Sequence, residues 1–363
     1  MNKSIKVAIV GVGNCASSLI QGIGYYSSRS LNGKRRAGLI HNSICGYTIK
    51  DIEIVSAFDV NIKKIGRKIS DAIFIEPNCT KIFYRNKLLF KSKVLPGPIL
   101  DGITKRLSKL VNIHRIRKGM AEWQKLVVSE LVGKKVDILI SYLPVGSKEA
   151  TRFYAKCALL ARVGYINAIP EFICSTGKWD NFFNKAGIPC AGDDIKSQIG
   201  ATILHRVLIS LIDKRGGIIE NTFQLNIGGN TDFLNMMDED RLISKRMSKT
   251  EAVTEIVKRY KFDTKIGPSD FVPYLKDNKI CFIEINGRQF GDIPFKLEAR
   301  LSIEDSPNSA GVMVDVIRLI KVAMDKGLGG YQDFSSYYFK HPKKQFDENF
   351  CKNIVESFIK NNS

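Results

Sequence analysis

SIKVAIVGVGNCASSLIQG, residues 4–22, is the stretch that decides the fold of this chain. It begins with a β-rich apolar run of the kind that forms buried parallel strands, and a helical apolar pattern follows its glycines. Between the two lies GVGNCA, a G-x-G-x-x-A loop. Its first glycine permits a tight turn, its second lets the backbone approach a pyrophosphate, and its small last residue lets the helix pack on the strand. This order favours a dinucleotide site over an ordinary turn, with contacts expected from Gly11, Gly13, Asn14 and Cys15.

The acid that would bind the adenosine ribose is expected at the end of the second strand. Residues 53–58, EIVSAF, are predicted as this strand, and Asp59 follows them. A polar insertion at residues 27–46 places Asp59 beyond the roughly 20 residues of the minimal unit. A carboxylate here favours NAD over NADP, because it would repel a 2′-phosphate. An acid that ends a strand can also be a turn residue, so both interpretations stay open.

The next segments predict a doubly wound parallel sheet, because short apolar runs alternate with helical patterns of roughly 10–15 residues. Further strands are expected at residues 136–142, 165–168 and 186–191, and a helix at 148–162. Ser141 and Ser147 lie near the carboxyl end of a strand, where cofactors bind in such sheets. Tyr154, on the following helix, is a cofactor candidate for which a place in the core is the competing interpretation.

GDDIKSQIGATILHR, residues 192–206, marks a seam between two halves of the chain. Asp193, Asp194 and Lys196 precede an apolar helical repeat, and charges at a helix start are expected to gather anionic partners. The predicted domains are a Rossmann NAD-binding domain at 1–191, an α+β catalytic domain at 192–304, and C-terminal helices at 305–363 that return to the first domain. A variable basic insertion is placed at about 61–125, with helices around an excursion at 96–98.

Beyond the seam, polar loops and isolated lysines supply candidate ligand contacts. NIGGNTD, residues 226–232, combines amide and carboxylate side chains with glycines that let a ligand approach the backbone. Lys245 and Lys249 would share one helix face, a repulsion that a bound anion would justify and that two solvated lysines would also explain. Lys340 lies among aromatic residues that could desolvate it, or it could extend to solvent.

The last third of the chain predicts strands and one long helix. A strand is expected at 222–227, and alternating strands of an antiparallel sheet at 281–286 and 294–302. A strong helix should follow, with Ser306 as its N-cap, Pro307 at its first position and Gly327 at its end. We expect this helix to pack back on the first domain.

Composition limits the class of protein. With 363 residues and 44% apolar content the chain can bury a large core. Without a run of ~18 apolar residues or a cationic and apolar leader, we expect neither a membrane span nor a signal peptide. Eight scattered cysteines without a CxxC pair, together with four distant histidines, indicate free thiols in a reducing cytoplasm instead of a zinc site or disulfides.

The net charge of +20 raises the question of a nucleic acid or another polyanion as partner. Residues 61–120 hold fifteen Lys and Arg against three acidic residues, with KKIGRK at 63–68 and RIRK at 115–118. A solvated, lysine-rich surface is the interpretation that we favour, because no helix-turn-helix, RNP or zinc-finger spacing accompanies the charge.

Motifs along nearly the whole chain resemble those of the myo-inositol-1-phosphate synthase family, in its shorter, actinobacterial-like form. They occur in the family's order and are VAIVGVGNCASSLIQG, SYLPVGS, GDDIKSQIGATILHRVL, NIGGNTDFLNM, SKRMSKTEAV, IGPSDFVPYL, GRQFGD and DSPNSAGV. Several such motifs together are specific, whereas residues 61–125 match the family poorly.

This resemblance implies an isomerising cyclase that converts D-glucose 6-phosphate to 1D-myo-inositol 3-phosphate, the first step of inositol and inositol-phospholipid biosynthesis. NAD would oxidise C5, the ketone would permit enolisation at C6, an aldol step would close the ring onto C1, and the retained NADH would reduce C5. The resemblance also implies a homotetramer whose catalytic domain supplies a sheet to the interface. It leaves open whether a divalent or monovalent cation takes part, and at which ligands.

By motif match, Lys245, Lys249 and Lys340 resemble the family's active-site lysines. Asp194 would orient a lysine or the nicotinamide region, and Asp305 would partner a lysine.

The other implied contacts are Ser197, Asp232 and Lys245 near the nicotinamide, Asn226 and Asn230 near the bound ligands, and Lys249 and Lys340 on the substrate. Eukaryotic members carry a further lysine in a GDSK stretch, where this chain reads GPSD at residues 267–270. The complete set of active-site lysines therefore stays open.

Two alternatives remain. A two-domain NAD-linked dehydrogenase would release NADH at each turnover, but it leaves several lysines unexplained in a chain without a candidate catalytic histidine. A polyanion-binding protein on a Rossmann scaffold would use the basic region and would need neither the glycine loop nor the lysines beyond residue 240.

Overall fold

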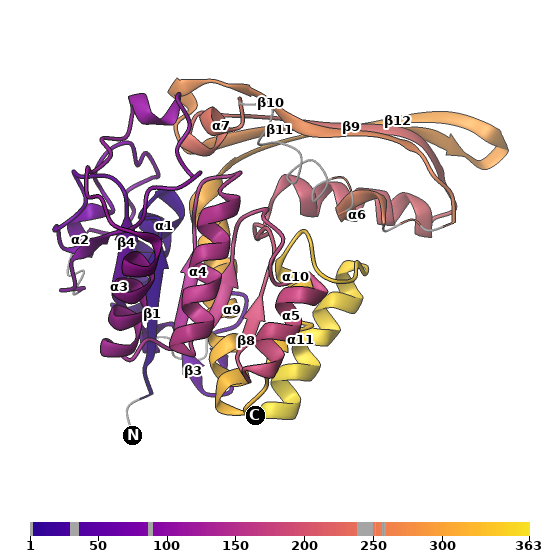
Figure 1. Cartoon of the computed structure of the whole chain (residues 1–363). Coiled ribbons are helices and arrows are strands. Elements are labelled where there is room, and N and C mark those ends of the chain that lie inside the picture. The colour runs from indigo at the N-terminus through magenta and orange to yellow at the C-terminus, as the bar shows by residue number, and fades with distance from the viewer. Residues whose placement is uncertain are drawn as a thin grey trace.

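The computed structural model describes residues 3–29, 36–85, 90–237, 250, 252–255, 257 and 259–363, the side chains of residues 268 and 269 excepted. Its strands form a seven-stranded sheet, a four-stranded sheet and a small two-stranded hairpin. The four-stranded sheet lies across one end of the parallel strands (Figure 1). Among the described helices, none is both long and apolar enough to cross a membrane.

The seven-stranded sheet is parallel, in the order β13-β8-β7-β6-β1-β4-β5, which confirms the predicted Rossmann-type α/β fold. Its strands are β1 (Ile5–Val10), β4 (Ile52–Asp59), β5 (Val94–Pro96), β6 (Ile138–Ser141), β7 (Gly164–Asn167), β8 (Pro189–Ala191) and β13 (Gly330–Tyr331). The chain runs outward from β1 in both directions, so a crevice for ligands is expected at the carboxyl ends of β1 and its neighbours.

Helices cover both faces of this sheet, as its apolar strands require. On one face, α1 (Asn14–Ser27) packs against α9 (Asp305–Asp325). On the other face lie α3 (Met120–Gly133), α4 (Lys148–Ala161) and α5 (Gly177–Lys185). Strands β6 and β7 are buried along their whole length between the two layers (Figure 1).

The four-stranded sheet has the order β10-β9-β11-β12. Its strands are β9 (Ile218–Gly228), β10 (Asp263–Phe271), β11 (Asn278–Gln289) and β12 (Ile293–Glu304). β11 runs antiparallel to both β9 and β12, which confirms the antiparallel strands predicted near 281–286 and 294–302, whereas β10 runs parallel to β9. Helix α6 (Ala201–Lys214) packs on one face of this sheet (Figure 1).

Helix α9 begins where β12 ends and leads the chain back to the parallel sheet. It contacts α1 and the strands β1, β6, β7 and β8, as expected from its apolar pattern. The predicted N-cap is wrong, because the helix begins at Asp305 after Glu304 and Ser306 is already its second residue. The Ser306 hydroxyl donates instead to Asp277, in the turn just before β11, at 2.8 Å. Gly327, with φ +67°, follows the end of the helix as predicted.

Residues 61–125 differ from expectation. In its described part, this stretch contains one four-residue α-helix, α2 (Ile69–Ala72), and a 3-10 turn at Leu107–Lys109 before α3, instead of several helices. The short strand β5 (Val94–Pro96) leads into the predicted excursion at 96–98. Between these elements the backbone is irregular, and isolated β-bridges, such as the one between Asn61 and Ile113, connect its segments. Ile69, Ala72 and Ile73 of this stretch are buried together at α2, whereas Val94, Leu107 and Val111 are buried at scattered positions, so one helical period does not run through it.

The remaining described elements are short or terminal. A hairpin of β2 (Ser43–Ile44) and β3 (Tyr47–Thr48) begins at the end of the predicted polar insertion, with β3 just beyond it. Helices α10 (Ser335–Tyr338) and α11 (Glu348–Asn362) follow β13. Where one domain ends and the next begins stays a prediction.

Ile317→Ala should show how much the fold depends on α9. Ile317 is fully buried between α1 and the parallel sheet, and such truncations cost about 2–5 kcal/mol of stability. The midpoint of urea unfolding should fall accordingly. Val132→Ala on α3, where the side chain is 57% exposed, should leave it nearly unchanged. Equal effects of the two substitutions would contradict the central place given to α9.

Candidate active site

A pocket lies at the carboxyl ends of β1, β4 and β6, beside residues of the four-stranded sheet and the start of α9. It brings together residues from both halves of the chain. The predicted site residues that line it are Gly11, Gly13, Asn14, Cys15, Asp59, Tyr154, Asp194, Ser197, Asn230, Asp232, Asp305 and Lys340. Tyr154 is packed in the core, as its competing interpretation expects, and a cofactor contact by Tyr154 stays a prediction.

The glycine loop has the geometry that a dinucleotide needs. Gly11 has φ +89°, and a Cβ there would lie 2.6 Å from the Tyr142 carbonyl oxygen, so the turn tolerates only glycine. A Cβ added at Gly13 would meet no atom within 4 Å, so the loop presents bare backbone to the pocket. Helix α1 begins at the next residue, and its first free N–H groups favour negative charge. These features fit the pyrophosphate of NAD.

Asp59 holds this loop in place from the end of β4. One carboxylate oxygen accepts the Val12 N–H at 2.8 Å, and the other accepts the Asn61 N–H at 2.8 Å. Each carboxylate oxygen has a second lone pair, so these bonds leave room for a ribose hydroxyl. The turn interpretation therefore describes the structure, and the ribose contact stays a prediction.

Lys340 pairs with Asp194 in the pocket at the carboxyl ends of the parallel strands. Its Nζ donates to Asp194 Oδ1 at 2.7 Å and to the Ile195 carbonyl oxygen at 2.8 Å. The Lys340 N–H also donates to the Asp194 carbonyl at 2.7 Å, which joins the segment after α10 to the segment after β8. The ammonium is thus held in one position in the pocket wall.

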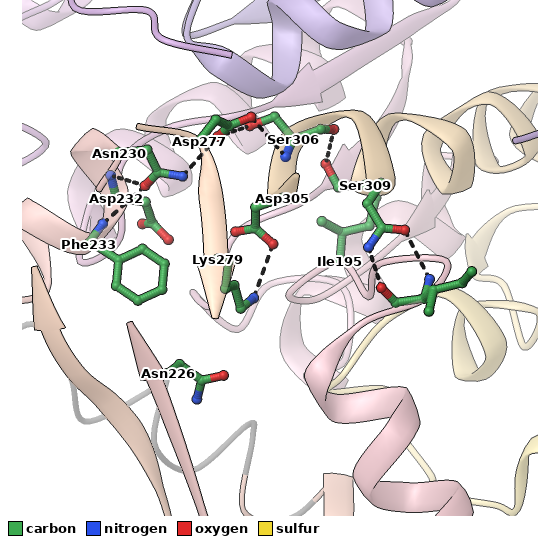
Figure 2. Close-up of polar contacts among 12 residues, drawn as sticks. Ile195, Asn226, Asn230, Asp232, Phe233, Asp277, Lys279, Asp305, Ser306 and Ser309 are labelled. Atoms are coloured by element: carbon green, nitrogen blue, oxygen red, sulfur yellow. Dashed lines mark hydrogen bonds and ion pairs between the residues drawn. The ribbon is translucent and has the colours of Figure 1, made fainter. Parts of the chain in front are cut away.

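A second ammonium comes from the four-stranded sheet. Lys279, in β11, donates to Asp305 Oδ1 at 3.0 Å (Figure 2). Burial lowers the pKa of Lys279, but the Asp305 charge and hydrogen bond outweigh it, and the pKa lies above its ordinary value. Lys279 therefore stays a cation, and Asp305 has the lysine partner that its motif implied.

Asp277 ties together the segments around this ion pair (Figure 2). Its carboxylate accepts from Asn230 Nδ2 at 3.0 Å, from Ser306 Oγ at 2.8 Å and from the Ser306 N–H at 3.2 Å. Asn230 also caps α7 (Thr231–Asn235) through its side-chain oxygen. Burial, with a contribution from the Asp305 charge, raises the pKa of Asp277 to about 6. The loop after β9, the start of β11 and the start of α9 are thus held as one unit.

The charges at the seam do not form the anion site that was predicted at a helix start. Helix α6 begins only at Ala201. Asp193 is buried and accepts from Asn167 and from three backbone N–H groups of residues 173–175, so it stabilises the interior. Lys196 is also buried and donates to the Ser336 carbonyl oxygen at 2.9 Å, and burial lowers its pKa to about 8. Asp194, paired with Lys340, is the member of this cluster that faces the pocket together with a lysine.

Other predicted residues do not line the pocket or fall outside the described residues. Asn226 is buried and donates to the Gly267 carbonyl oxygen at 2.9 Å, and Ser141 is buried at the end of β6, so neither belongs to the described pocket wall. Ser147 is also buried outside it. Lys245 and Lys249 fall outside the described residues.

The Cys15 thiol is neutral, because burial raises its pKa to about 12. It lines the pocket and contacts Ser306 and Ser309 as a small polar side chain. This residue is therefore not an activated nucleophile.

Sequence reasoning missed Lys279 and Asp277. A signal for Lys279 was present, because it shares the two-residue alternation of Cys281 and Ile283, which lie on the buried face of β11. A lysine in register with buried residues indicates a paired or ligand-facing ammonium. Asp277 had no comparable local signal, because its hydrogen-bond partners Asn230 and Ser306 come from two distant segments.

The comparisons agree with this architecture. The family model for myo-inositol-1-phosphate synthase matches residues 200–306. An inositol-3-phosphate synthase of Mycobacterium tuberculosis is 46% identical over 98% of this chain and 95% of its own length. One of Corynebacterium glutamicum is 44% identical over 98% of each chain. The chain belongs to the myo-inositol-1-phosphate synthase family.

A solved structure of a myo-inositol-1-phosphate synthase-related protein from Thermotoga maritima has the same fold, with a TM-score of 0.84 at 23% identity over 98% of each chain. Inositol-phosphate synthases as a family use NAD, in keeping with the glycine loop. In the part of the chain that the structure describes, no three His, Cys, Asp or Glu side chains gather closely enough to hold a metal ion, so a cation requirement stays a prediction.

The raised pKa of Asp277 predicts a pH dependence of stability. Between its ordinary value of 3.8 and about 6, the folded chain holds a proton that the unfolded chain has lost. The free energy of unfolding contributed by this group therefore falls as the pH rises through this range. Asp277→Asn lacks that contribution, so its stability relative to the unmodified protein should improve from pH 4 to pH 6. Urea unfolding at both pH values, with Asp263→Asn as the exposed control, measures the difference. If the stability difference between Asp277→Asn and the unmodified protein were the same at pH 4 and pH 6, the prediction would be wrong.

Proposed function

We propose that this chain is an inositol-3-phosphate synthase that cyclises D-glucose 6-phosphate to 1D-myo-inositol 3-phosphate with recycled NAD. The supporting observation is the convergence of two lysine–carboxylate pairs on a pocket that begins at a glycine loop. The 44–46% identity to inositol-3-phosphate synthases over nearly the whole chain supports the same reaction.

Bound NAD would accept the hydride from C5 and return it after ring closure. The chain's own residues would serve the steps between. Oxidation at C5 and enolisation at C6 place negative charge on substrate oxygens, and preorganised ammonium groups stabilise such charge more strongly in a pocket than in water. Lys279 and Lys340 are proposed for this role. Asp305 and Asp194 orient them, and Asp305 also keeps Lys279 protonated.

The other site residues are proposed from their positions or motifs. Ser197 and Asp232 line the pocket and are assigned to the nicotinamide end of NAD. Lys245 and Lys249 are assigned to the active site by their motif, and the dianionic substrate phosphate needs cations of this kind. A divalent or monovalent cation at this site stays a prediction.

A homotetramer is proposed from the outer face of the four-stranded sheet. Residues at alternate positions share that face, and they include Phe223, Leu225 and Ile227 of β9 and Ile280 and Phe282 of β11. Leu225 and Phe282 are directly paired and are 36% and 39% exposed in the single chain. These residues form an apolar strip beside the charged Glu284, Glu298 and Arg300, and an exposed apolar strip rimmed by charges is typical of an interface between subunits. A cytoplasmic location is proposed because all eight cysteines are free thiols.

The reaction is tested by incubating the protein with glucose 6-phosphate and substoichiometric NAD. Inositol monophosphate, followed by phosphorus NMR, should form in large excess over NAD, without accumulation of NADH by absorbance. NADH that rises in step with product would identify the dehydrogenase alternative instead. No turnover of either kind would contradict the proposal.

Lys279→Met and Lys340→Met should each lower kcat at least 100-fold, because each removes one preorganised cation, and such groups are worth about 10²–10³ in rate. Lys343→Met is the matched control, because Lys343 lies three residues from Lys340 but pairs with Asp180 near the surface. Binding of NADH, measured by fluorescence, should persist in all three variants. Full activity of either site variant would remove that lysine from the mechanism.

Phe282→Glu should convert the tetramer to smaller species, because it replaces an apolar contact of the exposed strip, paired with Leu225, by a carboxylate. Light scattering coupled to size-exclusion chromatography measures the mass. Leu160→Glu on α4, where the side chain is 51% exposed, is the control and should leave the mass unchanged. An unchanged mass for Phe282→Glu would show that subunits meet elsewhere.

A further inference from the structure

The glycine loop has a buried cation beside it. Lys64 follows β4 and is only 3% exposed. Its Nζ donates to the Val12 carbonyl oxygen of the loop at 2.7 Å and to Asn78 Oδ1 at 2.8 Å. Lys64 also lines the pocket, together with Gly11 and Gly13. The ammonium is thus fastened to the same loop that presents its backbone to the pocket.

This cation has only neutral hydrogen-bond acceptors in the described part of the chain. Asp59 is the nearby carboxylate, but its two oxygens accept the N–H groups of Val12 and Asn61. Burial lowers the pKa of Lys64, and the Asp59 charge only partly opposes this. An ammonium buried in this way is costly unless an anion joins it. It has three N–H donors, and the two described bonds leave one for a ligand.

A short segment fixes the position of Lys64 from the other side. Asn78 donates from Nδ2 to the Val12 carbonyl oxygen at 3.0 Å and to the Ile73 carbonyl oxygen at 2.9 Å. Asn14, in the glycine loop, accepts from the N–H groups of residues 79 and 80. Pro77 and Asn78 both line the pocket. Lys64 therefore lies between the loop and a second wall and has little freedom to turn away.

We infer that Lys64 is an anion-binding residue of the cofactor site, whose ammonium contacts the pyrophosphate of the bound dinucleotide. This inference rests on the proposed function only in taking a dinucleotide as the ligand. It accounts for a cation buried without an ion pair, because the ligand supplies the missing negative charge. It also explains how the Asp59 carboxylate can lie close to a bound phosphate at the glycine loop, because the Lys64 charge offsets the repulsion between the two anions.

The test compares ligands with and without phosphate, using calorimetry on the full chain freed of copurified dinucleotide. Lys64→Met removes the charge at similar length, and Lys64→Gln removes it but keeps a donor for the Val12 carbonyl oxygen. We expect the affinity of both variants for ADP to be at least tenfold lower than that of the unmodified protein. Their affinity for adenosine should stay within twofold of it. Lys64→Arg should retain most of the affinity for ADP. Lys63→Met, at the exposed neighbouring lysine, should change the affinity for neither ligand.

Three outcomes would overturn the inference. Equal losses for ADP and adenosine would show that Lys64 only supports the loop. A loss in Lys64→Met without one in Lys64→Gln would show that the hydrogen bond to Val12 matters and the charge does not. Unchanged affinity for both ligands would remove Lys64 from the site. If the unmodified protein bound neither ADP nor NADH, the proposed function would fail together with the inference, whereas normal binding with unaffected variants would leave the proposed function intact.

Discussion

The rest of this structure depends on one constraint: each of two lysine ammonium groups in the pocket must be paired with a carboxylate. Lys279 needs Asp305 and Lys340 needs Asp194, because an ammonium withdrawn from water is costly without a carboxylate partner. The partners lie 26 and 146 residues apart in the chain. The polypeptide must therefore return twice to the carboxyl ends of the parallel strands, once from the four-stranded sheet and once from the C-terminal segment.

The fold meets this constraint with elements that are themselves locked in place. Helix α9 begins with Asp305 at the pocket and buries its length against α1 and the parallel sheet. At the seam, Lys196 and Arg206 both bond Glu348 of α11, which fastens the C-terminal helix near the segment that carries Lys340. The pocket is positioned by the core and not by its own loops, as a site that works by preorganised charge requires.

Several site residues were predictable because they belong to local patterns. The glycine loop and Asp59 follow from a strand, a turn and a helix that are close in sequence, and Asp194, Asp305 and Lys340 stand in distinctive motifs. Lys279 could have been found from the alternation of β11, which places it in register with buried residues. Asp277 could not, because its importance comes from Asn230 and Ser306, two residues that only the folded chain brings to it.

By itself, the sequence determined the parallel α/β core, the antiparallel pair of strands, the long returning helix and the family, because each rests on periodicity or on contiguous motifs. The tertiary structure decided which charges face the pocket. Of the two adjacent carboxylates at the seam, Asp193 turns into the interior and Asp194 meets Lys340. It also decided that α9 begins at Asp305 and that Lys64 lies against the glycine loop. These outcomes depend on burial and on partners distant in the chain, and no local pattern of residues encodes them.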